Sequence, residues 1–294
     1  MQQTLLEKTR SHYDEFPFIE GGASRIRWWR EYLRDFLPDQ DIRDRLIVDV
    51  GSSVGEIARG LIDRKARLAC LDLSLNSLKR CQQINPEAQT FHGNALELPF
   101  ANDSFDHAIS IGVLHHTPDC RRGFKEIARV TAPGGTIVVF LYNYWSIYNV
   151  IYHVSKPIRS TVPLDRIPHW ALKFLQPFVK SHLGQRLNEQ QLRNLLGDKL
   201  WTPQATFHSV SEVRRWGTQE GLILVGTKNF FLGYAKVMRF LKHGRLAADV
   251  RREIGLKCTK CDAAPMLRSP AGYRCRRCGY TLSYVGGIIR CIEP

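Results

Sequence analysis

A carboxylate and two glycines near residue 50 are the first residues whose types and spacing could do chemistry. Asp49 ends an apolar run, and Gly51 and Gly55 follow at the spacing D-x-G-x-x-x-G. The glycines permit a tight turn and a close backbone approach to a ligand. A dinucleotide loop would have G-x-G-x-x-G without an acid, since a carboxylate repels pyrophosphate. The loop therefore predicts a ligand that carries positive charge.

Two later strand ends add groups that suit a nucleoside. Asp72 can accept both hydroxyls of a ribose, and the flanking Leu71 and Leu73 can pack on an adenine face. Asn94 offers an amide oxygen to an adenine amine, and the Ala95 N–H can donate to a ring nitrogen. An adenosyl group joined to a sulfonium and an ammonium, as in S-adenosylmethionine, fits both sets of residues.

Four segments occur in the order and context of one family: VDVGSSVG (48–55), LDLS (71–74), GNALELPFANDSFDHAISIGVLHHTPD (93–119) and FKEIARVTAPGGTIVVF (124–140). Over roughly residues 40–142 the chain resembles class I S-adenosylmethionine-dependent methyltransferases. It is closest to the group with quinone-biosynthesis C-methyltransferases and many small-molecule enzymes. The resemblance assigns cofactor contacts to Asp49, Gly51, Gly55, Asp72 and Asn94.

We extend the predicted cofactor site to their neighbours Ser52, Ser53, Leu73, Ala95 and Ile111. Two positions depart from the family's pattern. Relatives usually have Gly where Ser53 stands and often Asp where Asn94 stands. Asn94 keeps an acceptor oxygen, whereas the Cβ of Ser53 is expected to shift the methionine end of the cofactor slightly.

The segment after the fourth predicted strand faces the methyl group in this fold. Methyl transfer is an in-line displacement, and an oxygen or nitrogen acceptor must also lose a proton. His115 and His116 are therefore candidate catalytic bases; the alternative is that they pack or cap the next turn. Tyr13 either closes over the cofactor, as an N-terminal Tyr often does in relatives, or anchors its helix.

Four cysteines near the C-terminus form two C-x-x-C pairs, Cys258 with Cys261 and Cys275 with Cys278. Each pair directs two thiolates at one point, and two such turns make a tetrahedral site. We expect structural zinc there, without an open position for catalysis. The tail CGYTLSYVGGIIRCIEP resembles the small zinc-ribbon activator that partners certain tRNA, rRNA and release-factor methyltransferases, except that it lacks a Pro usual before the last apolar residues.

The net charge of +14 is concentrated in the second half of the chain. Residues 1–141 carry −1 and residues 142–294 carry +15. Such asymmetry suggests an anionic partner, which could be nucleic acid, a phosphorylated metabolite or a membrane surface; a basic surface without a partner is the alternative. Arg274, Arg276 and Arg277 of the ribbon could contact phosphates, or the ribbon could only stabilise the fold.

Apolar runs alternate with helical patterns, which predicts a mainly parallel sheet covered on both faces. The expected strands are residues 46–50, 68–73, 89–92, 107–111 and 136–141, with returning strands at 221–225 and 229–232. The expected helices are a short one ending near residue 12, then 24–37, 56–63, 75–83, 123–130, 209–219 and a basic helix ending near residue 252. The predicted fold is α/β, Rossmann-like, with these domains: a helical cap (1–40), a methyltransferase domain (41–253) with a helical insertion (143–205), and a zinc ribbon (254–294).

One window lacks Lys, Arg, Asp and Glu, from Thr131 to Ser155. Because it contains Pro133-Gly134-Gly135 and several polar residues, it predicts a buried strand running into an aromatic helix and no membrane span. The N-terminus shows no signal peptide, and the cysteine usage favours a reducing, cytoplasmic setting.

These observations support three functions. The first is a methyltransferase for a small acceptor, with anionic, phosphorylated and lipid-like molecules as candidates and peripheral membrane contact left open. The second is a tRNA or rRNA methyltransferase that holds RNA through its ribbon. The third is a binding protein that retains the cofactor fold without turnover. The sequence does not indicate an oligomeric state.

Overall fold

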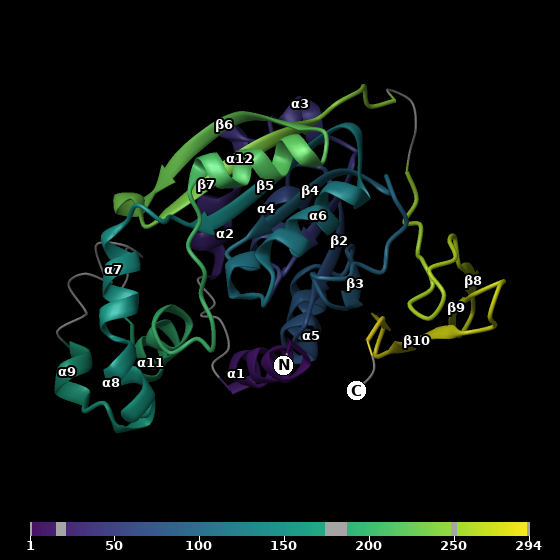
Figure 1. Ribbon diagram of the computed structural model, residues 1–294. Helices are drawn as coiled ribbons and strands as arrows, with labels where there is room; N and C mark the ends of the chain where they lie inside the picture. The colour runs from purple at the N-terminus through teal and green to yellow at the C-terminus, as the bar shows by residue number, and fades with distance from the viewer. Residues whose placement is uncertain (1, 16–21, 174–186, 248–251, 293–294) are drawn as a thin grey trace.

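Five strands form the parallel centre of the sheet: β1 (Leu46–Val50), β2 (Arg67–Asp72), β3 (Gln89–His92), β4 (Phe105–Ile111) and β5 (Thr131–Tyr142). The computed structural model describes residues 2–15, 22–173, 187–247 and 252–292 (Figure 1). Their order is β5-β4-β1-β2-β3. Every residue of β1 is buried because helices cover both faces of the sheet. The predicted Rossmann-like α/β fold is confirmed.

Helices cover both faces of this sheet. Trp29 of α2 (Gly22–Tyr32) and Leu61 of α4 (Glu56–Ile62) pack on one face. Phe124 of α6 (Cys120–Val130) and Trp216 of α12 (Val210–Gln219) pack on the other. Helix starts follow from capping side chains: Ser74 accepts the Ser77 N–H and so opens α5 (Leu75–Ile84).

The N-terminal region contains more elements than the two predicted helices. These are α1 (Gln2–Glu15), α2, the short 3₁₀ helix η1 (Leu33–Asp35) and α3 (Asp39–Ile42). The turn predicted at residues 133–135 lies inside β5, at an irregularity in its pairing with β4. Within the described residues, no helix has both the length and the apolarity to cross a bilayer.

The prediction of a basic helix that ends near residue 252 is wrong over residues 235–242. This segment is β7 (Ala235–Lys242), which pairs antiparallel with both β5 and β6 (Leu222–Phe230). The two returning strands predicted at 221–232 are one strand, β6, with a bulge near Gly226. Side chains of β7 enter both cores, Val237 on one face and Phe240 on the other, and this burial outweighs the helical appearance of its spaced cations.

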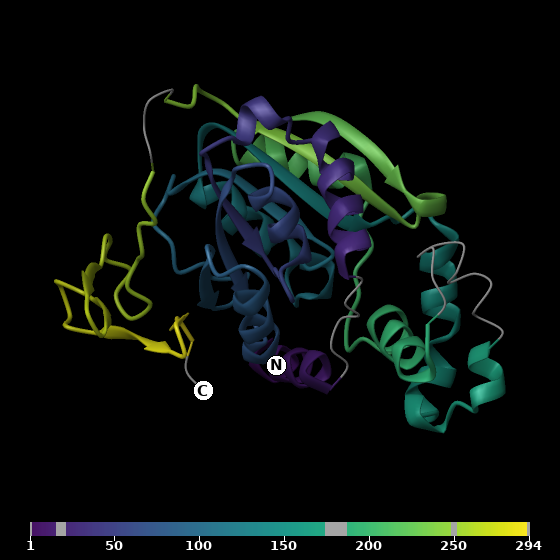
Figure 2. The same ribbon diagram turned by 180° about the vertical axis from the view of Figure 1, so that it is seen from behind.

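The predicted insertion is helical where it is described. It contains α7 (Ile147–Val154), α8 (Lys156–Thr161), η3 (Leu164–Arg166), α9 (His169–Lys173) and α11 (Glu189–Lys199); residues 174–186 lie outside the described part. Figure 1 shows these helices and α1 gathered on the same side of the sheet, and Figure 2 shows the same arrangement from behind.

Four C-terminal strands continue the sheet beyond β3: β8 (Leu267–Ser269), β9 (Gly272–Arg274), β10 (Thr281–Val285) and β11 (Ile288–Arg290). β11 lies parallel to β3, with Ile289 opposite Phe91, and the others follow as antiparallel neighbours. Leu256 and Leu282 belong to the same apolar core as Phe100. The ribbon is therefore packed against the sheet it follows.

Candidate functional site

The loop after β1 is held in place by backbone hydrogen bonds. The N–H groups of Gly51 and Ser52 both donate to the carbonyl of Leu71 at the end of β2, at 2.7 and 3.0 Å. Gly51 has φ 81°, and a Cβ there would lie 2.2 Å from Cγ2 of Val113. Glycine is therefore required at this position both by the turn and by its neighbour.

Asp72 joins the first two loops at the carboxyl edge of the sheet. Its two carboxylate oxygens accept the N–H groups of Ser53 and Ser74, each at 2.8 Å. A carboxylate has about four acceptor positions, so these bonds leave capacity for hydroxyl donors. The structure thus brings Asp72 to the loop whose glycines were predicted to bind the cofactor.

Asp49 is buried with one oxygen unused. The residue is 1% exposed, and among the described residues nothing forms a hydrogen bond with its Oδ2 or with Oγ of buried Ser52. Burial, followed by the charge of Asp72, raises the pKa of Asp49 to about 8. A buried acceptor without a donor beside a glycine cradle fits a ligand with an ammonium group.

Ser53 occupies a left-handed backbone conformation, with φ 49°. Glycine adopts this conformation without a steric penalty, which fits the Gly that the family resemblance leads us to expect here. The departure noted in the sequence is therefore a strained position in the loop.

The remaining predicted cofactor residues lie at the ends of β2, β3 and β4. Asn94 Oδ1 accepts the Leu96 N–H at 2.9 Å, so the amide oxygen predicted for adenine also closes a turn. The carbonyl of half-buried Leu73 is 3.0 Å from His92 Nε2. Ala95 is buried and Ile111 half-buried. Their contacts with a cofactor remain a prediction.

His115 and His116 lie in the short 3₁₀ helix η2 (Leu114–His116) after β4, and both are buried. His116 Nδ1 lies 2.9 Å from the Gln204 carbonyl and 3.2 Å from Thr202 Oγ1, which itself donates to that carbonyl; the tautomer with the proton on Nδ1 satisfies all three contacts. Nε2 then holds the lone pair and has no partner among the described residues. Burial lowers the pKa of His116 to about 4, against the opposing effect of Asp198. His115 instead packs on the ring of Tyr142 at 3.7 Å between centroids.

A polar cluster that the sequence did not predict lies beside His116, and we call it the Asp198 cluster. Its members come from four separate segments: Tyr13, His116, Tyr142, Asp198 and Lys199. Asp198 Oδ2 is 2.8 Å from Lys199 Nζ, and Tyr13 donates to Asp198 Oδ1 at 3.4 Å. Lys199 donates to the Tyr142 hydroxyl at 3.3 Å, and the His116 ring lies 6.1 Å from that of Tyr13.

The charges of this cluster stabilise one another. Burial opposes ionisation of Asp198, but Lys199 and His116 outweigh it, so the pKa of Asp198 lies below its ordinary value. Burial likewise opposes the charge of Lys199, yet Asp198 raises the pKa of Lys199. The cluster therefore presents an ionised pair beside a neutral histidine. No local motif marks Asp198 or Lys199; only the predicted insertion pointed to this region.

The four predicted metal ligands are brought together. Ligand atoms of Cys258, Cys261, Cys275 and Cys278 all lie within 4.8 Å of one another. Two of the sulfur pairs are 3.5 and 3.6 Å apart, between Cys258 and Cys278 and between Cys261 and Cys275. Zinc–sulfur bonds of about 2.3 Å in a tetrahedron place sulfurs about 3.8 Å apart, so the cluster fits that ion.

Comparison with known proteins relates this chain to a family. A family model described as a methyltransferase domain matches residues 48–139. Demethylmenaquinone methyltransferase of Bacillus cereus (strain B4264) is 30% identical over 240 residues, which cover 79% of this chain and 91% of that protein. The chain belongs to the class I S-adenosylmethionine-dependent methyltransferases.

Other relatives match over shorter stretches. The chloroplastic 2-methyl-6-phytyl-1,4-hydroquinone methyltransferase of Spinacia oleracea is 33% identical over 114 residues, covering 36% of this chain and 33% of that protein. Demethylmenaquinone methyltransferase of Lysinibacillus sphaericus is 36% identical over 148 residues, covering 46% of this chain and 58% of that protein. The chain thus spans a third to somewhat over half of these two relatives. A solved S-adenosylmethionine-dependent methyltransferase of Mesorhizobium loti, 21% identical with a TM-score of 0.51 over 75% of this chain and 99% of that one, shares the fold.

Proposed function

We propose that this protein transfers a methyl group from S-adenosylmethionine to a small aromatic acceptor of the hydroquinone type. The Asp198 cluster is the observation that carries the proposal, since it places an unpartnered histidine nitrogen and aromatic rings beside the end of β4. Three relatives named above carry quinone or hydroquinone substrates in their names, which supports the same acceptor class.

The loop residues bind and orient the cofactor in this proposal. Asp49 receives its ammonium group, and Asp72 receives the ribose hydroxyls. When bound, the cofactor supplies an electrophilic methyl group on a positively charged sulfur. In-line attack by an acceptor held opposite the sulfur would form the bond to the methyl carbon as the sulfur–carbon bond breaks, which would leave a neutral thioether.

His116 takes the proton that the acceptor loses. Its Nε2 holds a lone pair and no partner among the described residues. The positive charge that leaves sulfur reappears on the imidazole, so the net charge of the site is unchanged. The Asp198 carboxylate favours that imidazolium, and Lys199 favours an acceptor oxygen with negative charge.

A substrate test separates this function from its alternative. Purified protein is incubated with methyl-labelled cofactor and either a short-chain demethylnaphthohydroquinone or total RNA, with and without RNase. We expect label in the hydroquinone, with a mass gain of one methylene. Label only in an RNase-sensitive fraction would instead favour the RNA methyltransferase, for which exposed Arg274, Arg276 and Arg277 are the supporting surface.

We also propose that the four cysteines hold structural zinc. Cys275 and Cys258 belong to the apolar core shared with the sheet, so loss of the ion would loosen that core as well as the ribbon. Chelation should lower the thermal midpoint, and added zinc should restore it. An unchanged midpoint after metal analysis has shown removal would contradict the proposal.

A further inference from the structure

Helix α7 and the start of α8 expose an apolar side to solvent. Ile147, Val150, Val154 and Ile158 follow one another at helical spacing and are 55–72% exposed. The opposite side of α7 is packed, since Tyr152 lies 5.4 Å from Phe207 between ring centroids. An ordinary surface helix has polar residues on its outer side, and α7 has no Lys, Arg, Asp or Glu at all.

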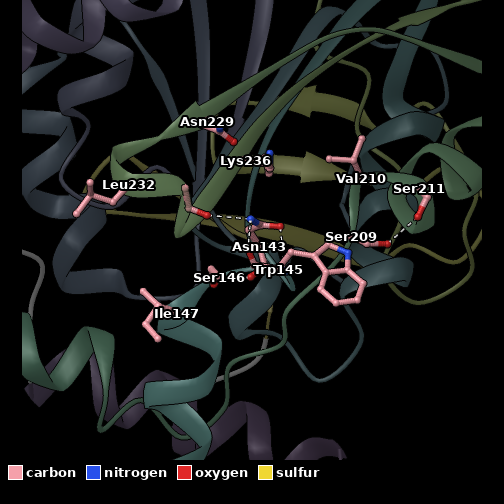
Figure 3. Close-up of a pocket in the computed structure, with 11 residues that line it drawn as sticks. Asn143, Trp145, Ser146, Ile147, Ser209, Val210, Ser211, Asn229, Leu232 and Lys236 are labelled. Carbon is pink, nitrogen blue, oxygen red and sulfur yellow. Dashed lines mark hydrogen bonds between the residues drawn. The ribbon is translucent and has the colours of Figure 1, made fainter.

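The exposed side continues past the helix. Trp145 is 79% exposed and Leu232, at the tip of the β6–β7 hairpin, is 82% exposed. Both line one open groove together with Ile147, as Figure 3 shows. We call the six residues Trp145, Ile147, Val150, Val154, Ile158 and Leu232 the apolar ledge. An apolar surface contributed by two separate elements exceeds the scattered exposure that soluble proteins normally show.

One cation lines the groove of the apolar ledge, and others lie near the ledge in the sequence. Lys236 lines the same groove, and exposed Lys156 lies two residues before Ile158. Arg166 and Lys173 are exposed in the helices that follow, and Asp165 is the one carboxylate within residues 144–173. Apolar and tryptophan side chains with a basic margin match the interface of a membrane that contains anionic lipid.

A second copy of the chain is a poorer occupant. A two-fold contact through the apolar ledge would place the Lys156 and Lys236 of both copies at one interface. Repulsion between these cations would oppose such a dimer, whereas an anionic lipid surface attracts all of them.

We propose that the apolar ledge docks the protein on the surface of an anionic membrane. The ledge enters the region between headgroups and acyl chains, and the surrounding cations contact phosphate groups. The docking proposal depends only on this surface, whereas the consequence of docking for catalysis depends on the proposed function. The inner side of α7 carries Tyr148, whose ring is 5.0 Å from that of Tyr142 in the Asp198 cluster. One helix therefore separates the bilayer from the site of an apolar acceptor.

Vesicle flotation tests the docking without any turnover. The full chain is mixed with phosphatidylcholine vesicles that contain no phosphatidylglycerol or about one third of it. We expect flotation with the anionic vesicles and a steep loss at high salt. Protein that stays in the bottom fraction with both vesicle types at low salt would overturn the proposal.

A pair of double variants locates the contact. Ile147→Glu with Val154→Glu should lower vesicle affinity at least about tenfold. Ile223→Glu with Val225→Glu is the matched control, because it places the same charges at two exposed apolar residues of β6 and should leave flotation unchanged. An equal loss in both double variants, or a concentration-dependent dimer that only the first abolishes, would refute membrane docking through the ledge.

Turnover distinguishes docking from function. The first double variant should still methylate a water-soluble, short-chain hydroquinone at the wild-type rate. It should lose activity only on a long-chain hydroquinone embedded in anionic vesicles. Flotation of a wild-type protein that methylates neither substrate would refute the proposed acceptor while leaving the docking proposal standing.

Discussion

The cofactor side and the acceptor side of the proposed site are built in different ways. The cofactor side uses the ends of consecutive strands, so its main groups all lie between Asp49 and Ala95 and are fixed largely by backbone hydrogen bonds. The Asp198 cluster collects side chains from Tyr13 to Lys199, on elements that meet only in the folded protein. Cofactor binding and methyl transfer should therefore respond separately to mutation.

The strongest test of this separation is His116→Gln. It removes the Nε2 lone pair and should lower kcat by about 100-fold to 1,000-fold, while calorimetry should show unchanged affinity for S-adenosylmethionine. His243→Gln, at an exposed histidine after β7, is the control and should have no effect. A parallel loss of cofactor affinity in His116→Gln would show that the two sides are coupled.

Gly51→Ala should weaken cofactor binding. Its φ of 81° and the 2.2 Å approach of a Cβ to Val113 force the loop to move, so we expect cofactor affinity to fall about 100-fold by calorimetry. Gly221→Ala is the control. Gly221 has a similar φ of 71°, but a Cβ there would meet no atom within 4 Å, so this variant measures the effect of backbone strain alone. Equal effects on cofactor affinity in the two variants would contradict the proposed role of this loop.

The pKa of Asp49 gives a pH signature to the cofactor side. Its folded pKa of about 8 is above the ordinary 3.8, so the free protein loses stability from this residue as pH rises between those values. An ammonium group favours the ionised form, so cofactor affinity should rise with pH up to about tenfold per unit below pH 8. Calorimetric titrations of the cofactor at about pH 5.5, 6.5 and 7.5 measure how its affinity changes with pH. Asp49→Asn should bind weakly and without this pH dependence; a retained slope would assign the effect to another group.

The smallest expected effect is that of Ser53→Gly. Relief of the left-handed strain should be worth about 1 kcal/mol, less the entropy that glycine loses on folding. Thermal unfolding should therefore change by a few degrees at most, with turnover within about twofold. A large loss of cofactor affinity would indicate that the Ser53 side chain itself contacts the cofactor.

The sequence predicts where β1 ends and its loop begins because that pattern is local, while the cofactor contacts of the loop stay a prediction. An apolar strand followed by an acid and glycines specifies both an element and its end, as β1 with Asp49 and Gly51 shows. Likewise the C-x-x-C spacing alone brings Cys258 and Cys261 together. The same reasoning names both His115 and His116 as candidate bases, and the tautomer that leaves Nε2 of His116 open depends on the distant Gln204 carbonyl.

The acceptor side could not be predicted in this way. Asp198 and Lys199 look like an ordinary charged end of a helix until α1 and β5 are placed beside them. Strand β7 was misread for a similar reason, because Lys236 and Arg239 suggest a helix surface while burial on two faces of a sheet is a tertiary property.

The pairing of β11 with β3 also has a consequence for how the chain folds. Phe91 and Ile289 face each other across strands about 200 residues apart, a contact of very high sequence separation that forms slowly. Until residues 288–290 have been synthesised and docked, β3 is an open edge that can pair with other chains. A chain in which β11 has not yet docked would therefore present an unpaired edge at β3, which the ribbon covers in the folded protein.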